Sequence, residues 1–124
     1  MSEPLAASKG DFSARGAPTG DRYEVRFSGN ADMRSRDALD ELLARLHQEA
    51  VQLECKEVVI DFHELEFMNS SCFKSVVAWI GRVQDLVQEQ RYRIRFLSKP
   101  ELLWQRRSLH ALRCFAVDLI TIET

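Results

Sequence analysis

The sequence has few glycines, prolines and cysteines, and it contains no long apolar run. Its 124 residues include five glycines, three prolines and three cysteines. No apolar segment approaches the roughly 20 residues that a membrane-spanning helix needs. The first ten residues also lack the apolar segment of a secretory signal. We therefore expect a cytoplasmic protein that makes no membrane contact.

The motifs of nucleotide and metal sites are missing as well. The sequence contains neither GxxxxGK[ST] nor GxGxxG, the two glycine-rich patterns that bind phosphate groups. The histidines His47, His63 and His110 share no ligand spacing with a cysteine or a carboxylate, so we expect them at the surface or its boundary. The sequence predicts no metal, no cofactor and no catalytic residue. We expect a protein that is not an enzyme.

The cysteines favour neither a disulfide framework nor a zinc site. Cys55, Cys72 and Cys114 are odd in number and far apart, whereas a stapled scaffold has an even, dense set and a zinc site has close pairs. Cysteine is among the most buried residue types. We therefore expect three reduced thiols in or near the core.

What is present fits one globular domain. Hydrophobic residues make up 45% and charged residues 29%, and 17 basic against 19 acidic side chains leave a net charge of −2. That balance argues against wholesale nucleic-acid binding. Residues 1–20 are rich in small and polar residues, which predicts a disordered leader. The folded domain is then expected to span residues 21–124.

Strand and helix patterns alternate through this domain. A period of two predicts strands at residues 23–27 and 92–96, and short apolar runs predict strands at 58–62 and 119–122. Helical spacing of apolar residues predicts helices over about 35–50, about 70–87 and about 98–115. Such alternation indicates largely parallel strands joined by helical crossovers.

Two details refine this α/β fold. Arginine or glutamate occupies every other position of the strands at 23–27 and 92–96, so we expect helices mainly on one face of the sheet. Ser98, Pro100 and Glu101 form a capping pattern that predicts the start of the third helix. Trp79 and Trp104 are either interface anchors or, as we favour, part of the core.

Basic residues concentrate late in the chain, and they allow two interpretations. They are Arg91, Arg93, Arg95, Lys99, Arg106, Arg107 and Arg113. One interpretation is a surface for nucleic acid or for an acidic partner. The other, which we favour because the chain is acidic overall, is the solvated face of a strand and a helix. We expect no direct contact with nucleic acid.

The segment from Val58 to Cys72, VVIDFHELEFMNSSC, contains a recognisable pattern. It resembles the STAS domain of bacterial anti-anti-sigma factors, in which a central strand leads through a short loop into an Asp-Ser-Ser-Gly turn and a helix. The resemblance covers roughly residues 22–124, element by element. It implies a mixed sheet of four to five strands with helices mainly on one face.

The resemblance also implies a function and a site. In that family the first serine of the turn is the regulatory phosphorylation site, which corresponds to Ser70, with Ser71 as the alternative. The partner is typically a serine kinase that doubles as an anti-sigma factor and is released on phosphorylation. The partner-binding residues are then expected to be Asn69, Ser70, Ser71, Cys72, Phe73 and Lys74. Asn69 and Cys72 depart from the family's Asp and Gly.

The chemistry of the turn is consistent with this role. A helix N-terminus presents unpaired N–H groups and a partial positive charge, so a phosphate is tolerated there. Phosphorylation adds about −1.5 to −2 charges, which opposes tight packing of a partner over the site. The simpler interpretation is that Asn69, Ser70 and Ser71 only cap the helix.

Two other functions are compatible with the same fold. The departures at Asn69 and Cys72 allow a constitutive adaptor that binds or activates another signalling enzyme without phosphorylation. A small-ligand or nucleotide sensor would use the ends of the central strands against the helix N-termini. For the phosphorylated regulator we expect a monomer or a weak dimer, with an anti-sigma factor or serine kinase-like protein as its partner.

Overall fold

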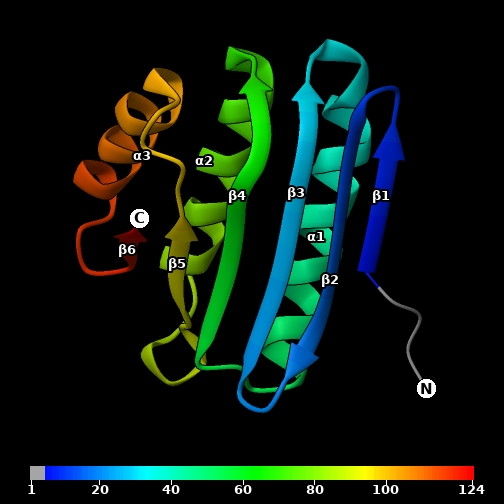
Figure 1. The fold of residues 1–124 in the computed structure, drawn as a ribbon. Coiled ribbons are helices and arrows are strands. Elements are labelled where there is room, and N and C mark those ends of the chain that lie inside the picture. The colour runs from blue at the N-terminus through cyan, green and yellow to red at the C-terminus, as the bar shows by residue number, and fades with distance from the viewer. Residues whose placement is uncertain (1–4) are drawn as a thin grey trace.

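The structure, a computed structural model, describes residues 5–124 as one six-stranded sheet with three α-helices (Figure 1). The strands lie in the order of the sequence: β1 (Leu5–Lys9), β2 (Phe12–Thr19), β3 (Arg22–Ala31), β4 (Glu57–Met68), β5 (Arg93–Leu97) and β6 (Ile120–Glu123). The helices are α1 (Arg36–Gln52), α2 (Ser70–Gln84) and α3 (Leu103–Phe115), with 3-10 turns η1 (Met33–Ser35) and η2 (Gln88–Gln90).

The connections between strands determine their directions. Tight turns join β1 to β2 and β2 to β3, and these pairs are antiparallel. A helix lies between each later pair, and β3 to β6 are parallel. A parallel pair needs such a crossover, because the chain must return to the starting edge of the sheet. The predicted alternation is therefore confirmed, and the sheet is mixed as the resemblance implied.

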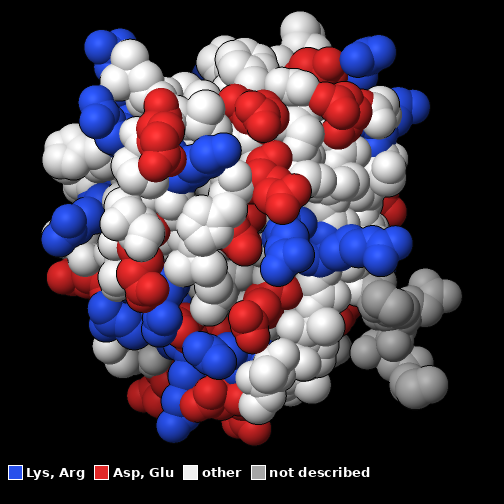
Figure 2. All heavy atoms as spheres, viewed as in Figure 1, with Lys and Arg blue, Asp and Glu red and all other residues white. Residues whose placement is uncertain are grey.

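The helices cover one face of the sheet, as predicted. Tyr23, Val25 and Phe27 of β3 are buried in the core, and α1 and α2 run behind the sheet in Figure 1. The opposite face carries interspersed acidic and basic side chains (Figure 2). On this face, Arg95 of β5 forms an ion pair with Glu57 of β4, with 2.9 Å between Nη2 and Oε2. This face can remain solvated because its charges face water.

The predicted disordered leader is wrong for residues 5–19. They form β1 and β2, and Leu5, Phe12 and Ala14 are at most 1% exposed. Large apolar residues are few there, but they lie where the hairpin can bury them. Gly16 also allows close packing, because a Cβ there would lie 2.7 Å from Val25 Cγ2. The first four residues of the predicted leader lie outside the described part of the chain.

Two predicted boundaries move by several residues. β4 continues to Met68 instead of ending near Phe62, with its ladder to β3 interrupted by two register shifts. α2 ends at Gln84, short of the predicted Val87. The added hairpin raises the strand count to six, above the four to five expected.

The predicted cap of the third helix is also wrong. α3 begins at Leu103 after a turn, and its N-cap Leu102 makes no side-chain cap bond. Ser98 is buried instead, and its hydroxyl donates to the Glu123 carbonyl at 3.3 Å. The Ser98 hydroxyl is therefore bonded to β6 and does not cap the helix. The start of α3 is held by Gln105, whose Nε2 donates to the carbonyls of Phe62 and Leu65 at 2.8 and 2.9 Å.

The core explains several other sequence observations. Trp79 is 1% exposed, which confirms core packing, and its Nε1 donates to Tyr92 Oη at 2.9 Å. Trp104 is half-buried and packs against the core. Cys55 and Cys72 are buried as expected, but Cys114 is exposed on α3, so the expectation is wrong for that thiol.

Candidate functional site at the start of helix α2

The start of α2 lies where two neighbouring parallel strands end. The Asn69 N–H donates to the Ala31 carbonyl at 2.9 Å, which ties the end of β4 to the end of β3. The Asn69 side chain then caps the helix, because its Oδ1 accepts the Cys72 N–H at 2.9 Å. The predicted helix start near Ser70 and the capping role of Asn69 are both present.

The two serines of the turn differ in their surroundings. Ser70 is exposed, and within residues 5–124 its hydroxyl forms no hydrogen bond. Ser71 is half-buried, and its Oγ accepts a hydrogen bond from Arg36 Nη1 at 2.9 Å. A molecule from solvent can therefore reach the Ser70 hydroxyl directly, whereas the Ser71 hydroxyl must first lose its hydrogen bond from Arg36.

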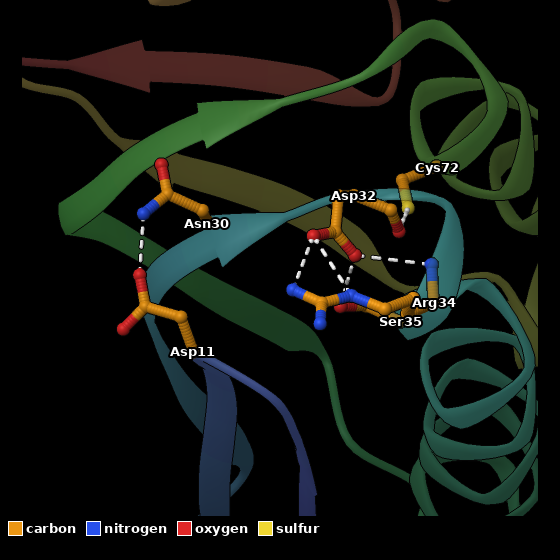
Figure 3. Close-up of polar contacts among 6 residues, drawn as sticks. All are labelled: Asp11, Asn30, Asp32, Arg34, Ser35 and Cys72. Carbon is orange, nitrogen blue, oxygen red and sulfur yellow. Dashed lines mark hydrogen bonds and ion pairs between the residues drawn. The ribbon is translucent and has the colours of Figure 1, made fainter.

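Cys72 has its side chain inside the molecule. It is 0% exposed, and its Sγ donates to the Asp32 carbonyl at 3.2 Å (Figure 3). Burial, and then the nearby Asp32 and Asp40 carboxylates, raise the pKa of this thiol. The thiol is therefore neutral at pH 7, and a partner cannot contact it in this conformation.

The segment beside the turn is held by its own polar contacts. Asp32 Oδ1 accepts the Arg34 N–H at 3.0 Å, and its Oδ2 pairs with Arg34 Nη2 at 3.0 Å. The hydrogen bond from Arg34 holds the pKa of Asp32 below its usual value. Figure 3 shows Asp32, Arg34 and Cys72 at this junction. The 3-10 turn next to α2 is thereby fixed at a charged, exposed corner.

The N-terminal hairpin reaches the same region. Asn30 donates its side-chain amide to Asp11 (Figure 3). Gly29, with φ of +83°, is required here because a Cβ would lie 1.9 Å from the Asp11 carbonyl oxygen. The β1–β2 turn is therefore packed against the end of β3, two residues before Asp32.

Exposed apolar side chains occur in both segments that meet at this corner. Met33 in η1 is 75% exposed and Phe67 near the end of β4 is 46% exposed. Of the predicted binding residues, Phe73 is half-buried against the core and Lys74 is exposed. Apolar groups rimmed by polar ones are typical of protein-binding surfaces.

Sequence reasoning missed three residues of this corner. Arg36 could not be assigned to Ser71, because nothing local links residues 35 positions apart. Met33 carried a usable signal, since it is an isolated large apolar residue between a strand and a helix. Phe67 was hidden because the strand was expected to end at residue 62, with a short loop after it.

The described part of the chain, residues 5–124, contains no group of three or more His, Cys, Asp or Glu side chains that could hold a metal ion. Its best-formed hollows are lined by residues other than 69–74. No helix described in it has the length and apolar character needed to cross a membrane.

The fold is similar to solved structures of anti-sigma factor antagonists. One, from Mycobacterium paratuberculosis, has a TM-score of 0.64 and 17% identity over 90% of this chain and 85% of its own. Another, the antagonist SpoIIAA in its unphosphorylated form, has a TM-score of 0.60 and 16% identity over 90% and 88%. Neither a family model nor a curated protein sequence matches the chain. The structural likeness confirms the STAS-type fold that the resemblance implied.

Proposed function

We propose that the chain is a non-enzymatic regulator that binds a partner protein through the start of α2 and releases it when Ser70 is phosphorylated. The partner is an anti-sigma factor or a similar serine kinase, as the resemblance and the names of the structural neighbours suggest. The docking surface, as we define it, consists of Met33, Phe67, Asn69, Ser70, Phe73 and Lys74.

The difference between the two serines carries this proposal. Ser70 offers an exposed hydroxyl at the first position of α2, while the Ser71 hydroxyl is engaged by Arg36. A kinase must place the serine oxygen in line with a phosphoryl group, which requires access from solvent. Ser70 is therefore the preferred acceptor and Ser71 the alternative.

The same position is suited to a phosphate that opposes binding without unfolding the domain. At a helix N-terminus the negative charge is favourable by about 0.3–1 kcal/mol, so α2 tolerates the modification. A partner packed over Met33 and Phe67 would have to desolvate the phosphate. A hundredfold loss of affinity requires about 2.7 kcal/mol, which one buried and unpaired charge can supply.

Partner capture followed by affinity measurement tests the proposal. Proteins retained by the full chain but not by Ser70→Asp are identified by mass spectrometry. Their affinity is then measured for wild type, Ser70→Asp and Ser70→Ala. We expect Ser70→Asp to bind at least tenfold more weakly and Ser70→Ala to bind within about threefold of wild type.

A matched control separates a local effect from a change in net charge. Thr19→Asp adds the same charge at an exposed position. Thr19 pairs with Arg22, which pairs with the first residue of β4, whereas α2 follows the last residue of β4. Thr19→Asp should leave partner affinity unchanged. Equal affinities for Ser70→Asp and Ser70→Ala would reject the switch.

A constitutive adaptor would never be phosphorylated, whereas the proposed regulator is phosphorylated under some condition. Intact-mass measurement of protein purified from its own host should show a species about 80 Da heavier under some growth condition, the mass of one phosphoryl group. Its complete absence across growth conditions, together with a partner bound at the same surface, would favour the adaptor.

A further inference from the structure

Helix α3 carries arginine side chains but no acidic ones, and one of its faces shares a hollow with Ser98, Pro100 and Thr124. Its 13 residues include Arg106, Arg107 and Arg113 but no Asp or Glu. Within residues 5–124 none of these three guanidinium groups forms an ion pair, whereas Arg26 and Arg95 on the open face of the sheet do. Since the whole chain has a net charge of −2, this is a local concentration of positive charge.

This hollow lies between α3 and the last strand. The hollow has a volume of about 270 Å³ and includes Arg106, His110 and Arg113 from α3. Leu109 and Ile122 contribute apolar surface to it, the latter from β6, which is an edge strand of the sheet. Arg107 does not line the hollow. Basic and apolar groups therefore face the same space.

The spacing of the basic groups fits an extended chain. Arg106, His110 and Arg113 follow one another at four and three residues, which is about 6 and 4.5 Å along a helix axis. Alternate side chains of an extended strand lie on one side about 6.6–6.8 Å apart. Arg106 and Arg113 are thus about 10.5 Å apart along the axis. Same-side carboxylates four residues apart in a strand are about 13.2–13.6 Å apart, and flexible arginine side chains can accommodate the difference.

The shape of the site selects among anionic ligands. A lipid bilayer or a nucleic-acid duplex presents a broad surface, and neither can insert into a hollow of this size. A peptide side chain can do so, and guanidinium groups pair with carboxylates in a planar, two-bond geometry. Leu109 and Ile122 then offer contact to an apolar side chain that lies two residues from each acidic one, on the same side of the strand.

We propose that this hollow docks an acidic extended segment of a partner protein. Carboxylates four residues apart in the segment pair with Arg106 and Arg113, and an apolar side chain midway between them, on the same side of the strand, packs against Leu109 and Ile122. The site is separate from the docking surface at α2 and does not depend on phosphorylation of Ser70. It gives the chain a second place to hold a partner.

Fluorescence anisotropy with the full chain tests this site. The probe, the Glu–Val peptide, is a fluorescein-labelled repeat of Glu-Ser-Val-Ser, which places Glu and Val on one side of an extended chain. Gln–Val and Lys–Val peptides of equal length, with Gln or Lys in place of Glu, serve for comparison. We expect the Glu–Val peptide to bind, and the other two to bind at least tenfold more weakly. The double variant Arg106→Gln/Arg113→Gln should lose at least tenfold in affinity for the Glu–Val peptide.

Arg107→Gln is the matched control, because it removes the same charge from α3 outside the hollow. It should change affinity by less than twofold, and Ser70→Asp should leave the affinity unchanged. A circular dichroism melt confirms that the variants fold. The proposal is overturned if the Glu–Val peptide does not bind, or if Arg107→Gln matches the double variant. Tighter binding to phosphatidylglycerol vesicles than to the peptide would also overturn it, by pointing to a membrane surface.

Discussion

Helices α2 and α3 each follow a strand of the same parallel set, but their first turns are fixed in different ways. At α2 a neighbouring side chain caps the helix, since Asn69 bonds the Cys72 N–H. At α3 no side chain caps the first turn, and Gln105 instead reaches across to the carbonyls of β4. A local signal determines one start, and a contact between residues some 40 positions apart determines the other.

As a result, the start of α2 is available for contact with other molecules, whereas the start of α3 depends on a buried side chain. The capped start of α2 leaves Ser70 exposed, because the bonds that define the turn are made by its neighbours. The start of α3 is fixed by the side-chain amide of Gln105, which is fully buried. Substitutions at α2 should therefore affect binding more than stability, and substitutions at Gln105 should do the reverse.

The largest effect on stability is expected from Gln105→Ala. It removes the donor to the Phe62 and Leu65 carbonyls and the acceptor of the Lys99 N–H, all at 2.8–2.9 Å. Buried polar groups left without partners should lower the free energy of unfolding by about 3 kcal/mol. Urea denaturation measures the change. Gln48→Ala, at an exposed position of α1, should stay within about 0.5 kcal/mol of wild type.

A smaller effect is expected from Asn69→Ala. Loss of the cap should lower the free energy of unfolding by about 1 kcal/mol, measured in the same urea experiment. Asn69→Asp keeps the acceptor oxygen and should retain wild-type stability. If Asn69→Ala matched or exceeded the cost of Gln105→Ala, the contrast between the two helix starts would not hold.

The smallest effect is expected on the pH dependence of stability. It concerns the contact between His47 of α1 and Tyr92, the residue before β5. His47 Nδ1 lies 2.7 Å from Tyr92 Oη, whose oxygen already accepts the Trp79 N–H. In the neutral tautomer whose Nδ1 carries no proton, the Tyr92 hydroxyl donates to His47. Burial, and then the positive charge of Arg82, hold the pKa of His47 below its usual value.

The sign of the pH dependence follows from that lowered pKa. Below about pH 6.5 the unfolded chain takes up a proton at His47 more readily than the folded chain does. The contribution of His47 to stability is thus complete above that pH and is lost as pH falls towards the folded-state pKa. Thermal melts between about pH 7 and pH 5 should show a smaller decline for His47→Gln than for wild type. Gln48→Ala, at an exposed position that does not titrate, should decline as wild type does.

Much of the fold was predictable because its signals are local. Alternation in residues 23–27 and helical spacing around Leu39 and Leu42 each identify an element without tertiary information. The start of α2 was predictable for the same reason, since Asn69 caps a residue only three positions away. The STAS-type arrangement then followed from the order of elements and the turn sequence.

The remaining features depend on contacts that no local pattern contains. β1 and β2 look disordered in composition, and they become ordered only because β3 and α1 bury Leu5 and Phe12. The Ser98 pattern fails because β6 uses that hydroxyl. Within the candidate site, the unequal surroundings of Ser70 and Ser71 depend on Arg36, which lies on another helix.

The most direct test of the account compares the chain phosphorylated at Ser70 with the unmodified chain in binding to the captured partner. Isothermal titration should show at least a tenfold weaker complex after modification, with the melting temperature of the isolated chain unchanged or raised. An unchanged affinity, or a phosphate found at Ser71 while Ser70 stays unmodified, would contradict it.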